Sequence, residues 1–161
     1  MWIDDGSLTL LCKQGRIFDI QRWIKEGRPL QLDLSIEPRP HGSQKTALEI
    51  AIETGQHSLV ELLLEGGYRV DEGRHSPIDV ALRCRRPDIV GLLVESGADV
   101  GRVDPDFVFD SYDLSLIECF YNLGVDYGER NALGLYLGQR ANKPLLGFCR
   151  QHKDDPSIHQ Q

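Results

Sequence analysis

The sequence predicts an all-α protein in which helical hairpins recur along the chain. Two segments align from end to end without a gap: TALEIAIETGQHSLVELLLEGG, which begins at Thr46, and SPIDVALRCRRPDIVGLLVESG, which begins at Ser76. In both, apolar residues recur at separations of three and four in two runs, which is the spacing of two amphipathic helices. Because one helical pair cannot bury its own apolar stripes, the repetition predicts a stack of pairs that share a continuous core.

An earlier segment, LTLLCKQGRIFDIQRWIKEG, carries the same pattern. The step from Gly15 to Gly27 equals the step from Gly55 to Gly67, so Trp23 takes the position of Leu63 in the next copy. The matching steps predict a first hairpin with the same register as the second.

Two later copies are less regular. The fourth is degenerate, because LSLIECFYNLG supplies a second helix whereas the preceding VDPDFVFDSYD is a poor first helix. The fifth is NALGLYLGQRANKPLLGFCRQH, whose second helix contains Leu145 and Phe148. About five helix-turn-helix repeats are therefore predicted, in a single domain that spans 1–161. The predicted repeats cover residues 5–28, 43–68, 74–98, 105–125 and 129–153.

The predicted helix ends carry suitable turn residues. A glycine closes each of the first four copies, and glycine adopts a left-handed cap that costs other residues about 1 kcal/mol. These glycines are Gly27, Gly67, Gly97 and Gly124. Ser76 followed by Pro77 is a helix start, since the hydroxyl can cap free amides and proline loses no useful donor there.

The openings TALEIA and SPIDVA resemble the TPLH-like opening of the ankyrin repeat family, whose regular repeat is about 33 residues long. The resemblance implies an ankyrin-type solenoid that binds a partner protein through the inner, first helices of its repeats and through the loops between them. It is strongest from about residue 43 to residue 101. Glu49 and Asp79 stand where the family commonly has a histidine that links neighbouring hydrogen bonds.

The loops between the predicted repeats differ in length from those of the regular family repeat. Gly67 to Ser76 spans 9 positions, against about 12 in the regular repeat. Gly27 to Thr46 spans 19 positions and includes IEPRPHGSQ, which is too long and too rich in proline for a simple turn. We therefore expect shortened or irregular hairpin loops, one of which projects from the stack.

Composition and charge favour some classes of protein over others. Hydrophobic residues make up 40% and charged residues 27% of the chain, which is a folding composition. The net charge of -7 opposes a broad nucleic-acid surface, because such a surface needs a clustered positive field. No stretch reaches the roughly 20 apolar residues of a membrane span, and MWIDDGSL lacks a signal-peptide pattern. We expect a cytoplasmic protein with no membrane and no nucleic-acid partner.

The sequence predicts no catalytic, cofactor-binding or metal-binding residues, and hence no enzyme. It lacks the common phosphate-binding, dinucleotide-binding, zinc-protease and hydrolase motifs. The histidines have no spacing that places two ligands on one helical face, and we expect the widely separated cysteines to be reduced, partly buried thiols. These residues are His41, His57, His75, His152 and His159, and Cys12, Cys84, Cys119 and Cys149.

The leading functional prediction is a non-catalytic protein-interaction module. Its expected surface combines the inner-helix face with the loops at residues 36–43 and 69–75. The predicted binding residues are Arg39, His41, Glu49, Glu53, Arg69, Arg74, Asp79, Arg83 and Arg86. Residues 69–86 contain five arginines and three carboxylates. This segment is either a binding site for an acidic peptide or a solvent-exposed face that binds no partner.

Two other functions remain open at this point. The chain is alternatively the N-terminal scaffold portion of a longer repeat array, or a structural protein that self-associates through its C-terminal repeat. Leu145, Leu146 and Phe148 motivate this alternative, because a terminal repeat normally needs a polar outer face. A small hydrolase or nucleotide-binding enzyme is the third and least favoured reading, since it would require a preorganised set of polar groups.

Overall fold

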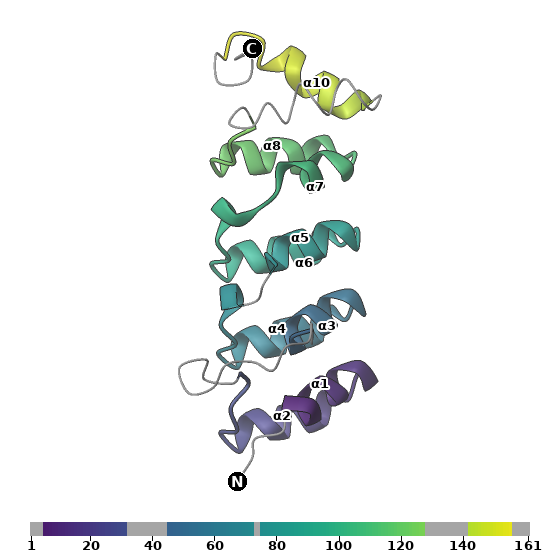
Figure 1. Ribbon diagram of the computed structural model, residues 1–161, viewed down its shortest axis with the longest axis vertical. Helices are drawn as coiled ribbons and strands as arrows, with labels where there is room; N and C mark the ends of the chain where they lie inside the picture. Colours follow the sequence, from purple (N-terminus) through teal and green to yellow (C-terminus); the bar gives the residue numbers. More distant parts are fainter. Residues whose placement is uncertain (1–4, 32–44, 73–74, 128–141, 156–161) are drawn as a thin grey trace. The chain divides into compact units, whose positions relative to one another are not determined.

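The computed structural model describes residues 5–31, 45–72, 75–127 and 142–155, with backbone alone at 5–7 and at 72. Every regular element in these ranges is helical, which confirms the predicted all-α class (Figure 1). The chain divides into two compact units, Met1–Ala98 and Asp99–Gln161. The predicted single domain over 1–161 stays a prediction.

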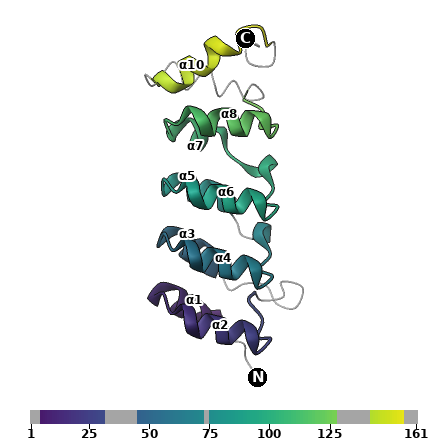
Figure 2. The same ribbon diagram turned by 180° about the vertical axis from the view of Figure 1, so that it is seen from behind.

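The first unit contains three helical hairpins. They are hairpin 1, with α1 (Asp5–Gln14) and α2 (Ile17–Lys25); hairpin 2, with α3 (Ala47–Glu53) and α4 (His57–Glu65); and hairpin 3, with α5 (Pro77–Arg83) and α6 (Pro87–Glu95). A short 3-10 helix, η1 (Val70–Glu72), follows hairpin 2. The inner helix α3 packs between α1 and α5, and the outer helix α4 packs on α6, so the hairpins are stacked (Figures 1 and 2).

The same turn closes each hairpin. The backbone N–H of Arg28 donates to Trp23 O at 3.2 Å, and that of Tyr68 donates to Leu63 O at 3.0 Å. Gly27 and Gly67, which lie between these partners, have φ of 67° and 92°. The predicted equivalence of Trp23 and Leu63 is therefore confirmed, and both side chains are buried.

A second repeated turn joins the two helices within each hairpin. Gly15 and Gly55 adopt left-handed φ values of 65° and 69° there, and Arg85 adopts a φ of 55° at the same place in hairpin 3. The side chain three positions before each turn residue is buried, and these side chains are Cys12, Ile52 and Leu82. Hairpin 3 thus keeps the backbone of its neighbours although it lacks their glycine.

The two predicted helix starts behave differently. The Thr46 hydroxyl accepts from the backbone of Glu49, while the Glu49 carboxylate accepts from the backbone of Thr46, which completes a capping box. The Ser76 hydroxyl makes no cap hydrogen bond and is buried without a partner among the described residues. The expected cap at Ser76 was therefore wrong, although Pro77 occupies the first turn of α5 as predicted.

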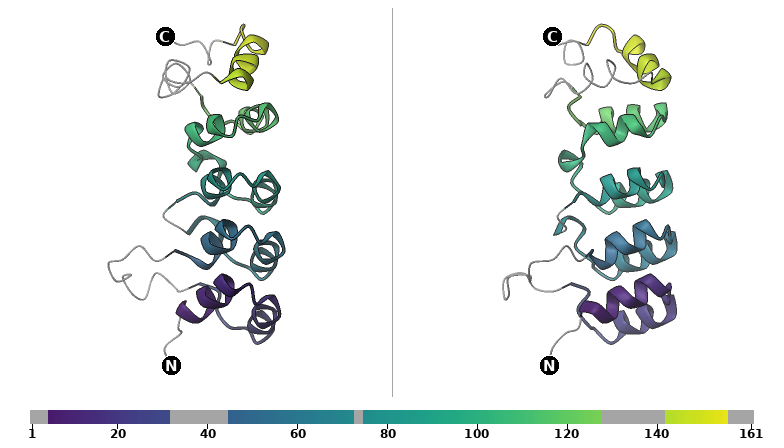
Figure 3. Two further views of the ribbon diagram at one scale, coloured as in Figure 1. Left: turned by 90° about the vertical axis from the view of Figure 1, so that its right-hand side faces the viewer. Right: turned by 45° about the vertical axis from the view of Figure 1, so that its right-hand side comes forward.

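The second unit contains η2 (Val100–Arg102), α7 (Pro105–Asp110), α8 (Leu114–Asn122) and α10 (Lys143–Gln151), as two views in Figure 3 show. The expectation of a poor first helix needs correction. Asp104 accepts from the backbone of Asp106, Pro105 occupies the first turn, and Val108 and Phe109 bury the far end of α7. Tyr112, with φ of 54°, makes the turn into α8, so the fourth hairpin is short but complete.

Asn142 joins the last helix to the fourth hairpin. Its side-chain amide donates to Phe109 O at 2.7 Å and accepts from the backbone of Leu145 at 3.0 Å. Leu145 and Phe148 are fully buried, and only Leu146, 42% exposed, faces solvent. The expected open apolar face at the end of the last copy was thus wrong for two of its three residues. The first helix predicted for the fifth copy lies outside the described residues.

Candidate protein-binding surface

The inner-helix face, from which four binding residues were predicted, is mostly buried. In α3, only Glu49 and Glu53 among the seven side chains are not buried, and in α5 only Arg83 is exposed. Glu49 is half-buried and held in the capping box with Thr46. Asp79 is 9% exposed. Glu53 and Arg83 are therefore the predicted inner-helix residues that a partner could reach most easily.

Glu53 and Arg83 share a register with a residue that the sequence analysis missed. Each lies two positions before the turn residue that joins its inner helix to its outer helix, and Lys13 lies two positions before Gly15 in the same way. All three side chains are exposed, and α3 packs on both α1 and α5. The residues Lys13, Glu53 and Arg83 thus form a row of alternating charge, named here the inner-helix row. The Gly15 to Gly55 offset in the sequence is the signal that identifies Lys13.

Lys45 adds a further cation near the middle of this row. Its Nζ lies 2.7 Å from Glu53 Oε2, although Lys45 precedes the start of α3 and Glu53 is its last residue. The Lys45 side chain is 58% exposed, so the ion pair contributes little to stability and leaves both groups accessible to solvent.

Arg86 was predicted to bind a partner, but it makes contacts within the stack. Its Nη1 donates to Gly55 O at 2.5 Å, and its Nε and Nη2 donate to the Asp88 carboxylate at 3.0 and 2.8 Å. The hydrogen bonds from Arg86 lower the pKa of Asp88 to about 2, and those to Asp88 raise the pKa of Arg86. Arg86 therefore links hairpin 3 to the turn of hairpin 2, and we leave it out of the proposed surface.

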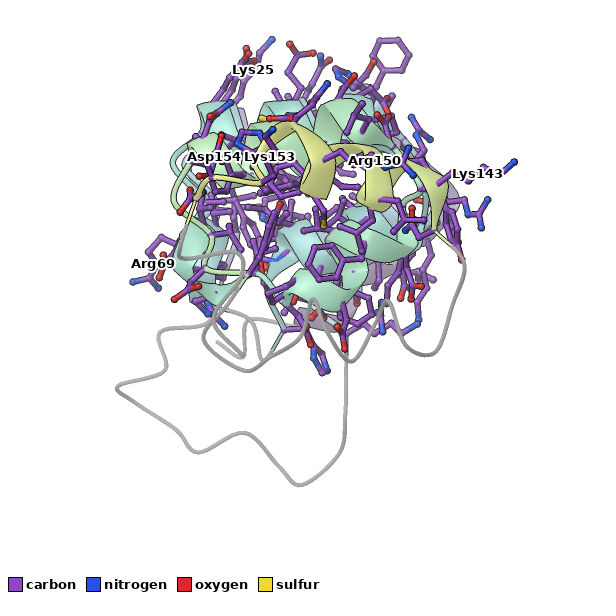
Figure 4. The ribbon with its side chains drawn as sticks, turned by 90° about the horizontal axis from the view of Figure 1, so that it is seen from above. Lys25, Arg69, Lys143, Arg150, Lys153 and Asp154 are labelled. Carbon is purple, nitrogen blue, oxygen red and sulfur yellow. The ribbon has the colours of Figure 1, made fainter. Side chains whose placement is uncertain are left out.

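Arg69 lies on the loop side of the first unit. Its backbone N–H donates to Gln31 Oε1 at 2.7 Å, and its carbonyl accepts from Gln31 Nε2 at 2.8 Å, so a side-chain amide bridges hairpins 1 and 2 as a peptide group would. A shallow depression of about 320 Å³ lies beside this bridge, lined in part by Ile24, Arg28 and Leu30. The Arg69 side chain points outward (Figure 4). Arg39, His41 and Arg74 lie outside the described residues.

The second unit holds a cluster of titratable groups between α8 and α10. His152 Nε2 lies 3.0 and 3.1 Å from the Glu118 carboxylate oxygens, and the Tyr121 hydroxyl donates to Asp155. Burial raises the pKa of the nearby Cys149 thiol, whereas a catalytic cysteine needs a lowered pKa. The rings of Tyr121 and Phe148 meet edge to face at 5.2 Å. These contacts hold α10 against α8, and the raised pKa of Cys149 does not favour a catalytic role for its thiol.

Among the described residues, no group of three or more histidine, cysteine, aspartate or glutamate side chains is arranged to hold a metal ion. The helices of those ranges include none with the length and apolar character that a membrane span requires.

Stacked helical hairpins with repeated turns and an exposed row of side chains define a helical-repeat protein. The family model described as ankyrin repeats, in three copies, matches residues 8–104, which is more than half of the chain. The chain therefore belongs to the ankyrin repeat family, as its sequence resemblance predicted, and ankyrin repeats are generally protein-interaction modules. The match includes all three hairpins of the first unit apart from the start of α1. No curated protein matches the chain.

Proposed function

We propose that this protein is a non-catalytic interaction module that binds a partner protein through the inner-helix row of its first unit. The observation that carries the proposal is the regular placement of Lys13, Glu53 and Arg83, one exposed charge at the same position of each stacked hairpin. A partner that presents charges of the opposite order would pair with all three at once.

The exposed side chains of the inner-helix row extend from helices that are already packed. Beneath it lie the buried side chains of Cys12, Ile52 and Leu82, each directly before its exposed residue. Because packed helices lose little conformational entropy on association, more of the contact energy remains as affinity. The alternating signs supply specificity, since a partner with like charges opposite the row would be repelled.

The loop edge is a second part of the proposed surface. Arg28 and Arg69 border the depression between hairpins 1 and 2, and the predicted loop residues Arg39, His41 and Arg74 follow these two hairpins in the sequence. Arginine guanidinium groups pair well with carboxylates through two parallel hydrogen bonds. We therefore expect acidic side chains in the part of the partner that meets this edge.

Affinity capture from native lysate tests the inner-helix row. Immobilised full-length protein is compared with Arg83→Glu and with Arg150→Glu, a control that makes the same charge change at an exposed position of α10. Circular dichroism verifies that both variants keep their helices. We expect the proteins captured by the wild type to be lost from Arg83→Glu and retained by Arg150→Glu, and identical capture by all three would reject the row as the binding surface.

A further inference from the structure

The outer face of α2 exposes a large aromatic side chain. Phe18 is 83% exposed, the highest value among the exposed large apolar residues of the described ranges. Gln21, Arg22 and Lys25 are also exposed, and they follow Phe18 at helical separations of three, four and seven. The four residues therefore form one continuous stripe along α2, named here the α2 stripe. The Lys25 side chain extends outward (Figure 4).

The other two outer helices carry different residues at the same positions. The residues of α4 that are equivalent to Phe18, Gln21 and Lys25 are Ser58, Glu61 and Glu65. The equivalent residues of α6 are Asp88, Gly91 and Glu95. The exposed aromatic ring and the cations thus belong to hairpin 1 alone among the three hairpins. The hairpin backbone does not depend on these side chains, since the other hairpins have the same turns without them.

The charges around the α2 stripe leave its cations available. Asp19 pairs with Arg16 at 2.6 Å, and Glu26 lies 3.6 Å from Arg28. Among the described residues, neither Arg22 nor Lys25 has an ion-pair partner. The segment 16–28 therefore carries four basic residues against two acidic ones, in a chain whose net charge is -7.

We propose that the α2 stripe is a second binding surface, which takes an acidic peptide segment of a partner protein. An apolar side chain of the segment packs on the exposed ring of Phe18, and two of its carboxylates pair with Arg22 and Lys25. Aromatic and arginine side chains together are the residues that most often dominate the binding energy of protein interfaces. The surface lies on an outer helix, so the inference does not depend on the inner-helix row.

The neighbouring charges favour a narrow ligand over an extended anionic surface. Glu61 and Glu65 are exposed on α4, the next outer helix, and Gly66, which follows α4, lies against the side chain of Ile24 in α2. A membrane or a nucleic-acid duplex that reached Arg22 and Lys25 would also meet these carboxylates and be repelled. A single peptide segment that follows α2 could pair with Arg22 and Lys25 without lying across Glu61 and Glu65.

Selection from a random peptide library on the immobilised full-length protein tests the proposal, with the affinities of the enriched peptides measured by fluorescence anisotropy. We expect acidic peptides that contain one aromatic or large aliphatic residue. Phe18→Ser, which installs the side chain found in α4, should weaken their binding about tenfold or more, and Phe18→Leu should restore part of it. Phe18 is exposed, so neither change is expected to disturb the fold.

An exchange of two charges separates the effect of the α2 stripe on peptide binding from the effect of the protein's net charge. The double variant Lys25→Glu with Glu65→Lys keeps the wild-type net charge and moves the cation from α2 to the same position of α4. We expect it to bind the peptides as weakly as Lys25→Glu alone, while Glu65→Lys and Arg83→Glu bind as the wild type does. Enrichment of no acidic peptides, or equal affinity for Phe18→Ser, would overturn the proposal. Phe18-dependent binding to phosphatidylserine vesicles without peptide binding would assign the stripe to a lipid surface instead.

Discussion

At the scale of single residues, two equivalent positions show that the same kind of side-chain hydroxyl can stabilise one helix start and not another. Thr46 and Ser76 both precede the first turn of an inner helix, and both have extended backbone. Only Thr46 forms hydrogen bonds there, as part of the capping box with Glu49. The buried Ser76 hydroxyl loses its contact with water and gains no described partner in return.

The pair gives a matched prediction. Thr46→Ala should lower the free energy of unfolding by about 1 kcal/mol, because the first turn of α3 loses its cap. Ser76→Ala should change it little or raise it slightly, because the removed hydroxyl is desolvated without compensation. Urea denaturation of both variants measures the difference, and equal losses would contradict the assignment of the cap to Thr46 alone.

At the scale of elements, the turns between inner and outer helices also connect neighbouring hairpins. Arg86, at the start of α6, reaches back to the carbonyl of Gly55 and pairs with Asp88 in its own helix. A Cβ added to Gly55 would displace the end of the Arg86 side chain, whereas the left-handed φ of 69° is what favours glycine at this position. In hairpin 2 the Gln56 side chain lies close to Gly15 in the corresponding place.

The Arg86 contact predicts a pH dependence. The pKa of Asp88 is lowered to about 2, so the folded state binds this proton less tightly than the unfolded chain does. The resulting stabilisation is fully present above the ordinary aspartate pKa of about 3.9, and it is lost as the pH falls through about 2. The stability difference between the wild type and Asp88→Asn should therefore shrink across this acid range. In Arg86→Ala, an NMR titration should find the Asp88 pKa raised toward its ordinary value, and an unchanged pKa would contradict the role of Arg86.

The elements could be predicted from the sequence, because apolar spacing and glycine position carry the needed information. The register of Trp23 against Leu63, and the left-handed glycines, followed from the equal steps between glycines in the first two copies. The left-handed turn at Arg85 was harder to predict, because arginine does not favour that backbone and only the gapless alignment with Gly55 pointed to it. The helix at α7 was expected to be poor, although Asp104 followed by Pro105 is a helix-start signal that the sequence contains.

The accessible residues of the proposed binding surface were harder to predict than the fold. Charge and position in the repeat identified Glu53 and Arg83, which are exposed. They could not distinguish these residues from Asp79, which is buried, or from Arg86, which bonds to a neighbouring hairpin. Exposure and side-chain pairing depend on which repeats lie side by side, and the pattern within one repeat contains no such information.

At the scale of the whole molecule, the first unit is a stack in which each hairpin contacts its neighbours. Hairpin 2 packs against both hairpin 1 and hairpin 3 through α3. The stability of such a stack is approximately the sum of hairpin contributions and of the contacts between adjacent hairpins. Substitutions in hairpins 1 and 3 should therefore act independently.

This independence is measurable at the buried residues that close each hairpin. Trp23→Ala and Leu93→Ala should each cost about 2–5 kcal/mol, because each leaves a cavity. The double variant should show the sum of the two losses within about 0.5 kcal/mol. Chemical denaturation gives all three values, and a clear departure from the sum would indicate coupling across hairpin 2.

The buried thiol of hairpin 1 has a practical consequence for the whole unit. Cys12 is inaccessible to solvent, and burial raises its pKa to about 12, so almost none of it is the reactive thiolate at neutral pH. An alkylating reagent can modify it only when hairpin 1 opens, whereas the exposed Cys119 is accessible in the folded protein. The rate of Cys12 alkylation, followed by mass spectrometry, would thus report how often hairpin 1 opens. The rate at Cys119 serves as the internal reference.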